Sequence, residues 1–328
     1  MRKPFLLLTV MVIIVNIMEC IAVPPSSTNN KPIIGILAQP TLTGKISKYG
    51  KYYIDAAYVK FVESGGARAV PIRYDLPVDE LRNYFNQVNG MLFPGGCIDL
   101  VTQPGSKHFT QYTQTQKLFM EWSMESFDTL NDYFPIYGTC LGFQAMALIL
   151  SNDTNIMQGG FDSENMTLPL DFTLSKGELV QTRLFHNQWE LIEQLTTRNV
   201  TFNAHRDAIP YNLWMGNHLL QNVQLIATNL DRKGQRYASL FEHKKFPFYA
   251  SQFHPEKPLF EWNPHEVINH SAESIVVNSY FGRFFVDECR RNFHKFNSPQ
   301  SEEKALIYNY VPIYTYELVN DFEQCYFV

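Results

Sequence analysis

The chain has 328 residues, of which 45% are hydrophobic and 18% are charged, and its formal net charge is −5 at pH 7. This balance is typical of a globular protein with a sizeable core, and it excludes a disordered chain. The negative charge offers no basic surface to a nucleic acid, so we expect no nucleic-acid partner.

The N-terminal segment predicts a secretory signal peptide over residues 1–22. Arg2 and Lys3 precede an apolar run at residues 5–18, and the small residue Ala22 ends a suitable cleavage site. The run is too short to span a bilayer comfortably, so an uncleaved anchor is the less favoured alternative. Because no later stretch is long and apolar enough to span, we expect a soluble mature chain with no membrane association, either secreted or lysosomal.

Four Asn-X-Ser/Thr triplets agree with that route. They begin at Asn152, Asn165, Asn199 and Asn269. Each triplet alone is a weak signal, but together with a signal peptide they are candidates for glycosylation.

The cysteine pattern indicates neither a disulfide scaffold nor a metal site. Four cysteines follow the expected cleavage site, at positions 97, 140, 289 and 325, with no Cys-x-x-Cys spacing. The chain also lacks His-Glu-x-x-His and Gly-x-x-x-x-Gly-Lys motifs, so we expect no metal and no cofactor. Cys289 and Cys325 remain a candidate pair that would tie down the C-terminal tail.

From residue 31 onward, strand-like and helix-like segments alternate. Predicted strands cover residues 32–37, 67–72, 90–94, 134–137 and 246–253. Predicted helices cover residues 52–64, 77–85, 113–130, 141–150 and 273–290. This alternation predicts an α/β fold, a three-layer sandwich with a mostly parallel central sheet.

The rest of the sequence pattern predicts one domain and a C-terminal tail. The pattern over residues 152–240 is too irregular for us to assign its strands. A polar stretch over residues 297–304 then leads into an aromatic-rich end. We therefore expect one domain over residues 23–296 and a C-terminal tail over residues 297–328 that packs on it.

Cys140 stands between a predicted buried strand and a predicted helix, within Gly138-Thr139-Cys140-Leu141-Gly142. Small neighbours permit the sharp turn of a nucleophile elbow, and a helix N-terminus favours the thiolate. The backbone N–H of Leu141 would face an oxyanion formed by attack of the sulfur. By itself, Cys140 is equally well explained as a small buried apolar residue.

Two further segments strengthen the case for catalysis. Gly95-Gly96 ends the third predicted strand, and although most such pairs are ordinary turns, Gly96 would also suit an oxyanion donor. His254 and Glu256 follow an apolar strand, and alternate residues of an extended segment point the same way. Glu256 would therefore orient the imidazole of His254 as the third member of a triad.

Together these segments resemble the class I glutamine amidotransferase-like superfamily, whose pattern is a Gly-Gly strand, a Gly-x-Cys-x-Gly elbow and a late His-Pro-Glu. Within it the chain is similar to the γ-glutamyl hydrolase family, and the resemblance runs across nearly the whole mature chain. The closer match rests on residues 49–54, 93–96, 137–143, 252–257, 261–262 and 303–308. It implies a flavodoxin-like α/β fold.

The resemblance also implies a function and its residues. The family cleaves the γ-linked glutamate chain of folates and antifolates through a Cys thioester, without a cofactor, as a homodimer. Carried over by motif, the catalytic residues are Cys140, His254, Glu256 and His205, and the substrate or oxyanion residues are Gly96, Leu141 and Tyr53. A surface histidine is the alternative for His205, because the residues around it match the family only loosely.

This chain departs from the family at two positions near the elbow. Gln144 stands where the family usually has Glu, and Cys97 stands where it has a small residue. Two other functions therefore stay open. One is a glutamine amidotransferase or glutaminase domain, and the other is a non-catalytic relative that binds γ-glutamyl ligands.

Overall fold

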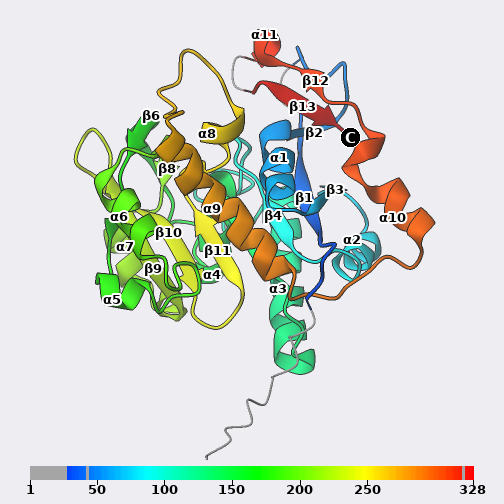
Figure 1. Ribbon diagram of the computed structural model, residues 1–328, viewed down its shortest axis with the longest axis horizontal. Helices are drawn as coiled ribbons and strands as arrows, with labels where there is room; N and C mark the ends of the chain where they lie inside the picture. The colour runs from blue at the N-terminus through cyan, green and yellow to red at the C-terminus, as the bar shows by residue number, and fades with distance from the viewer. Residues whose placement is uncertain (1–27, 42–43, 320–321) are drawn as a thin grey trace, which may run out of the picture.

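The computed structural model describes residues 28–41, 44–319 and 322–328 (Figure 1). The signal peptide predicted over residues 1–22 lies outside them. The strands are β1 (Ile33–Pro40), β2 (Tyr52–Asp55), β3 (Arg68–Arg73), β4 (Met91–Phe93), β5 (Ile136–Thr139), β6 (Gln158–Leu168), β7 (Asp171–Phe172), β8 (Thr201–Ala208), β9 (Val223–Leu230), β10 (Arg236–His243), β11 (Phe248–Ser251), β12 (Ile313–Tyr314) and β13 (Gln324–Phe327).

Most helices lie between these strands. They are α1 (Ala56–Ser64), α2 (Val78–Phe85), α3 (Gln111–Leu130), α4 (Leu141–Ser151), α5 (Lys176–Leu179), α6 (Trp189–Thr197), α7 (Tyr211–Gly216), α8 (Lys257–Phe260), α9 (Ala272–Cys289), α10 (Pro299–Ala305) and α11 (Tyr316–Val319), with 3-10 turns η1 (Leu219–Asn222) and η2 (Ile307–Asn309). Within the described ranges, no helix has both the length and the apolar character needed to cross a bilayer.

The main sheet has a parallel centre and antiparallel flanks. Strands β3, β1, β4, β5 and β11 are parallel neighbours in that order. Antiparallel strands β10, β9 and β7 continue the sheet beyond β11, and β2, β13 and β12 extend it from the end of β1. The parallel centre brings the carboxyl ends of β4, β5 and β11 to one edge, where ligands bind in such sheets.

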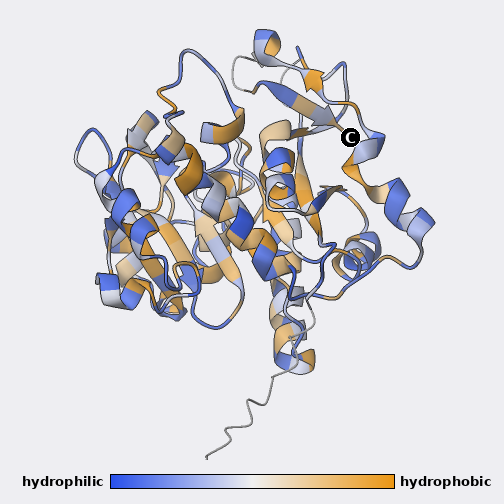
Figure 2. Cartoon of the chain, viewed as in Figure 1, coloured by the Kyte–Doolittle hydropathy of each residue, from blue (hydrophilic) through white to orange (hydrophobic). Residues whose placement is uncertain are grey.

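Helices cover both faces of the sheet, so the fold has three layers (Figure 1). On β1, Ile33 and Leu37 belong to a cluster that includes residues of α2, α3 and α4. Ile34 and Ile36 belong to a second cluster with residues of α1, α6 and α9. Because successive residues of a strand face opposite sides, an unbroken apolar run is buried on both. Figure 2 shows apolar residues on the inner strands and polar ones on α10, which has no buried residue.

The helix predicted over residues 52–64 is wrong in its first turn, because residues 52–55 form strand β2. β2 pairs with β1 on one side and with β13 on the other. This pairing overrides the local helical spacing. The helix begins at Ala56, and the side chain of Asp55 caps it by accepting the Ala57 N–H at 2.9 Å.

The C-terminal tail joins the domain through this sheet extension. Cys325 of β13 pairs with Asp55 of β2, and the Val328 N–H donates to the Tyr52 carbonyl at 3.0 Å. The candidate disulfide between Cys289 and Cys325 is wrong, since both are free buried thiols. The two thiols pack in different places: Thr315 donates to the sulfur of Cys325, whereas Cys289 ends α9 beside Gly90.

The region left unassigned from the sequence contains a separate two-stranded ribbon. Strands β6 and β8 pair in an antiparallel register with two irregularities. The ribbon meets the sheet edge through the His254 N–H, which donates to the Phe202 carbonyl of β8 at 2.8 Å. It therefore forms one wall beside the carboxyl ends of the parallel strands.

Candidate active site

Cys140 occupies a strained turn between β5 and α4. Its φ of 50° and ψ of −102° are rare for a residue with a side chain. The turn is tight because a Cβ on Gly142 would lie 2.1 Å from the Phe93 carbonyl oxygen. The Cys140 N–H donates to the Ser251 carbonyl of β11 at 2.8 Å, which fixes the turn to the neighbouring strand.

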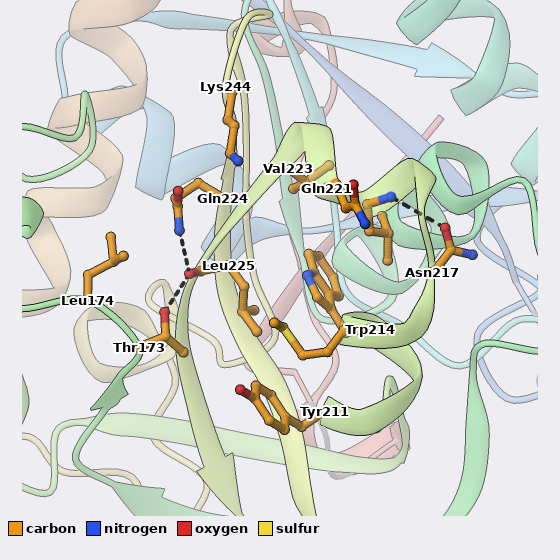
Figure 3. Close-up of a pocket in the computed structure, with 12 residues that line it drawn as sticks. Thr173, Leu174, Tyr211, Trp214, Asn217, Gln221, Val223, Gln224, Leu225 and Lys244 are labelled. Carbon is orange, nitrogen blue, oxygen red and sulfur yellow. Dashed lines mark hydrogen bonds between the residues drawn. The ribbon is translucent and has the colours of Figure 1, made fainter.

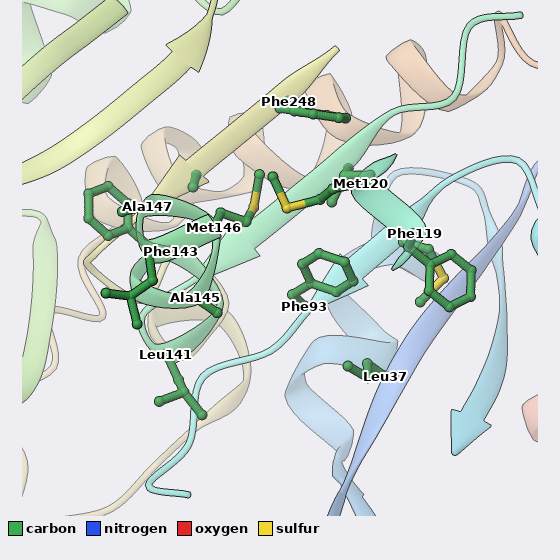
Figure 4. Packing of buried hydrophobic residues seen from close by; sticks show 14 of the residues in the cluster. Leu37, Phe93, Phe119, Met120, Leu141, Phe143, Ala145, Met146, Ala147 and Phe248 are labelled. Atoms are coloured by element: carbon green, nitrogen blue, oxygen red, sulfur yellow. The ribbon is translucent and has the colours of Figure 1, made fainter. Parts of the chain in front are cut away.

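The helix after the elbow is anchored by an apolar core. Figure 4 shows Phe143 and Met146 of α4 packed in a cluster that also includes Phe93 of β4 and Phe248 of β11. All four side chains are fully buried. Burial of this kind holds the first turn of α4, and with it Cys140, in one position.

His254 and Glu256 form a buried pair directly after β11. Nδ1 of His254 lies 2.6 Å from Oε1 of Glu256. This contact orients the ring, and Nε2 is the ring nitrogen that the carboxylate does not engage. Burial alone would lower the pKa of His254. The Glu256 carboxylate and the Cys140 sulfur outweigh burial and raise that pKa to about 10. A hydrogen bond to Cys140 contributes to the rise, so the imidazole and the sulfur are direct neighbours.

Gly95 brings the third segment to the same point. A Cβ at this position would lie 2.7 Å from Cε1 of His254 and 3.1 Å from Cβ of Cys140, so only glycine fits. Its N–H donates to the hydroxyl of Tyr58 at 2.8 Å, and that hydroxyl lies 3.4 Å from Nδ1 of His254. Gly95, Cys140 and His254 therefore lie together at one point.

Tyr53 reaches the site through Gln39, a residue that the sequence analysis missed. The Tyr53 hydroxyl donates to Oε1 of Gln39 at 3.1 Å, and Nε2 of Gln39 donates to the Gly95 carbonyl at 2.8 Å. A Cβ on Gly96 would lie 2.1 Å from Oε1 of Gln39. Gln39 is the penultimate residue of β1, and its place near the carboxyl end of a strand was the only signal that could have identified it.

A cleft of about 970 Å³ opens over this convergence. Gly96, Cys140, Leu141, Gln144 and His205 all line it. Leu141 is the first residue of α4, so its N–H has no acceptor within the helix and is available to a ligand. The cleft lining thus combines the Cys140 side chain, the His205 side chain and backbone donors.

His205 lies on β8 in the wall of this cleft and is only 6% exposed. Nδ1 lies 3.1 Å from the Asp207 carbonyl oxygen, which can only accept, so this nitrogen carries the proton. Burial and the nearby His254 lower the pKa of His205 to about 3. Nε2 is buried without a protein partner among the described residues. His205 is therefore neutral, and its Nε2 is an acceptor.

The candidate glycosylation sites differ in their surroundings. Asn152 and Asn199 are exposed. The side-chain amide nitrogens of Asn165 and Asn269 donate to backbone carbonyls, at 2.9 Å to His265 and 2.7 Å to Asn199 respectively. The first two asparagines are therefore more accessible to a glycosylating enzyme.

Two other features lie near or away from the cleft. Cys97 is exposed and lines the cleft beside Gly96. A separate cavity of about 330 Å³ is lined by Trp214 and Leu225, and its lining residues include neither Cys nor His (Figure 3). Within the described ranges, no group of three or more His, Cys, Asp or Glu side chains is placed to hold a metal ion.

Comparisons with known proteins agree on one family. Residues 32–160 match the Peptidase C26 family model. The γ-glutamyl hydrolase of Homo sapiens is 39% identical over 305 residues, covering 92% of this chain and 91% of that protein. γ-Glutamyl hydrolase B of Dictyostelium discoideum is 37% identical, covering 89% and 82%, and γ-glutamyl hydrolase 1 of Arabidopsis thaliana is 32% identical, covering 89% and 81%.

Solved structures with a similar arrangement are more distant. A putative GMP synthase component from Thermoplasma acidophilum has a TM-score of 0.45 at 16% identity, covering 79% of this chain and 94% of that one. A glutamine amidotransferase from Thermotoga maritima has a TM-score of 0.44 at 12% identity, covering 79% and 98%. Identity to the curated relatives, in contrast, extends over nearly the whole chain, and the chain belongs to the γ-glutamyl hydrolase family.

Proposed function

We propose that this chain is a cysteine hydrolase that cleaves γ-glutamyl bonds, with Cys140 as the nucleophile. The observation that carries the proposal is the convergence of Cys140, His254 and Gly95 at one end of the parallel strands. Three segments far apart in the sequence meet there beneath one cleft. Membership of the γ-glutamyl hydrolase family supports the same chemistry.

The first half of the reaction uses the Cys140–His254 pair. The raised pKa of His254 favours an imidazolium next to a thiolate. The sulfur attacks the γ-carbonyl carbon, and the oxyanion accepts hydrogen bonds from the N–H groups of Gly96 and Leu141. His254 then gives its proton to the leaving amine as the C–N bond breaks, which leaves a thioester on Cys140.

The second half returns the enzyme to its starting state. Water attacks the thioester carbonyl while His254 takes a proton from it, and the C–S bond breaks to release the acid. Glu256 stabilises the imidazolium at both stages through its 2.6 Å contact with Nδ1. His205, as a neutral acceptor in the cleft wall, would receive an N–H of the bound substrate.

Folate polyglutamates are the substrate class that we propose. The family name of the relatives specifies the γ-glutamyl bond, and the cleft of about 970 Å³ is large enough for an extended ligand. Product analysis on a γ-linked polyglutamate, with an α-linked peptide of equal length as control, tests both points. Cleavage of the γ-linked substrate alone is expected, and Cys140→Ala should abolish it.

Other outcomes of that assay would replace the proposal. Cleavage of both peptides would remove the γ specificity. Release of ammonia from glutamine without cleavage of the polyglutamate would favour an amidotransferase type of site. Binding of the polyglutamate without turnover would favour the non-catalytic relative. Turnover retained in Cys140→Ala would remove the nucleophile assignment.

Two further proposals concern the protein as a whole. The N-terminal apolar run and the four glycosylation triplets support entry into the secretory pathway, with secretion or lysosomal residence as the destination. Family membership supports a homodimer. Expression of the full chain in animal cells, followed by glycosidase treatment and light scattering, tests both. Absence of a glycosidase-induced mass shift or a monomeric mass would overturn the respective proposal.

A further inference from the structure

Two buried glutamines connect the cleft wall to the sulfur of Cys140. Nε2 of Gln144 donates to the Asp207 carbonyl at 2.7 Å and to Oε1 of Gln252 at 3.3 Å. Nε2 of Gln252 then donates to Sγ of Cys140 at 3.7 Å. Gln144 is 4% exposed and Gln252 is fully buried, so water does not compete for these contacts.

The orientation of both amides follows from the chemistry of the first contact. A backbone carbonyl oxygen only accepts, so Gln144 must turn its NH2 group toward Asp207. The second hydrogen of that NH2 group points to Gln252, which must therefore present its oxygen. With its oxygen committed in this way, Gln252 directs its own NH2 group at the sulfur.

We propose that Gln144 is a positioning residue that fixes the side-chain amide of Gln252 so that its N–H donates to the Cys140 thiolate. This inference rests on the proposed function, since it concerns the same nucleophile. A donated N–H stabilises a thiolate more than a thiol, because the hydrogen bond strengthens with the negative charge. Gln252 contacts the reacting sulfur directly, whereas Gln144 acts through Gln252.

The Asp207 carbonyl is the common anchor of this arrangement. It also accepts the Nδ1–H of His205 at 3.1 Å. One oxygen on β8 thus sets both the tautomer of His205 and the orientation of the two amides. This makes the identity of residue 144 consequential. A glutamate has at most one O–H to donate and cannot serve both Asp207 and Gln252.

Substitutions at position 144 should change the reactivity of the Cys140 thiol, although residue 144 does not contact the sulfur directly. In Gln144→Glu, an ionised carboxylate accepts the Gln252 NH2 group, so the Gln252 oxygen turns toward the sulfur and disfavours the thiolate. In Gln144→Met, the Gln252 amide is no longer held in one orientation, but nothing forces it into the opposite orientation. We expect alkylation of Cys140 by iodoacetamide near neutral pH to slow by roughly tenfold in the Glu variant and by less in the Met variant.

The readout is the pH profile of alkylation, followed by mass spectrometry of the Cys140 peptide in the full chain. Alkylation of Cys97 in the same sample is the internal control and should not change. The expected result is a profile of Cys140 displaced to higher pH in both variants. This measurement needs no substrate, so it remains decisive even if γ-glutamyl cleavage is not observed.

A double-mutant cycle tests whether Gln144 acts through Gln252. Gln252→Met should displace the profile by itself, and adding Gln144→Met to it should cause little further change. Two outcomes would overturn the proposal. One is a wild-type alkylation profile in both single variants at position 144. The other is additive displacement in the double variant, which would show that Gln144 affects the site by a separate, structural route.

Discussion

The hydroxyl of Tyr58 accepts the N–H of Gly95 at 2.8 Å and lies 3.4 Å from Nδ1 of His254. This one oxygen joins the loop that carries Gly95 to the histidine. Because it occupies the Gly95 N–H, the oxyanion role that we propose for the glycine pair belongs to Gly96.

Removal of this hydroxyl should weaken both the fold and the activity. Tyr58→Phe leaves the buried N–H of Gly95 without its acceptor, which costs about 1–3 kcal/mol of the free energy of unfolding. Loss of this hydrogen bond should also lower kcat/KM, because the loop that carries Gly95 and Gly96 is no longer held in place. Urea unfolding and steady-state kinetics measure the two effects, with Tyr211→Phe in the separate cavity as control. Unchanged values for Tyr58→Phe would contradict the assigned contact.

Gly95 tests the convergence of the three segments. A methyl group there would lie 2.7 Å from Cε1 of His254, so Gly95→Ala must displace either the imidazole or the loop that carries Gly95. We expect kcat to fall by about 100-fold or more, since small misplacements of reacting groups cost this much. Gly177→Ala is the matched control, because nothing lies within 4 Å of its added methyl group. Equal activity in the two variants would be inconsistent with this geometry.

The strained backbone conformation at Cys140 should lower the free energy of unfolding, and a glycine at this position should relieve the strain. Its φ of 50° disfavours any residue with a Cβ. Cys140→Gly and Cys140→Ala should both lack turnover, but the glycine variant should unfold with a free energy about 1 kcal/mol higher than the alanine variant. Thermal or urea unfolding compares them. A more stable alanine variant would show that the turn is not strained.

The Glu256 carboxylate should set the upper limit of the active pH range. The folded-state pKa of His254 is raised to about 10, so the side chain stays an imidazolium up to that pH. Glu256→Gln removes one of the charges that oppose burial, so the alkaline limb of the kcat/KM profile should move to lower pH. Activity at the optimum should fall by about 100-fold or more. An alkaline limb at the wild-type pH would refute this role.

A buried pair of carboxyl groups beneath the tail should make stability depend on pH. Burial raises the pKa of Asp55, and burial together with the charge of Asp55 raises the pKa of Glu261. Oε2 of Glu261 accepts the Glu323 N–H at 2.8 Å, which ties the pair to the tail. Other ionisable groups near it are Lys257, Glu256, Tyr53, Tyr58 and Cys325.

The direction of the effect follows from linkage. A carboxyl group whose pKa is higher in the folded state gives stability that is fully present below its unfolded pKa and is lost as pH rises through the folded value. The free energy of unfolding should therefore fall from pH 5 to pH 9, and Glu261→Gln should flatten this fall. His205 has the opposite sign below pH 6.5, so the difference between variant and wild type is the quantity to measure. Exposed Glu303→Gln is the control, and an equal slope in Glu261→Gln would exclude the pair as the cause.

The parallel centre of the fold could be predicted because its signals are local. β1, β4 and β5 are short apolar runs, and the glycines after β4 and around Cys140 mark tight turns within a few residues of each run. The same applies to the apolar strand that precedes His254. Local spacing thus predicted which segments end at the site edge.

Residues whose partners are distant in the sequence could not be found in this way. Gln39 and Tyr58 look like ordinary polar and aromatic positions until Gly95, from the loop after β4, lies against them. The ribbon that carries His205 has two register irregularities, so its sequence shows no regular alternation. Strand β2 depends on pairing with β13, which no local pattern can reveal.

That pairing has a consequence for how the protein folds. β2 obtains one of its two neighbours from residues at the opposite end of the sequence, so its hydrogen bonds cannot be completed until the ribosome has delivered them. Contacts between such distant residues form slowly, because a very long loop must close first. Tyr53 lies on this strand and holds Gln39 against the glycine turn. We therefore expect this side of the site to be among the last parts of the molecule to become ordered during synthesis.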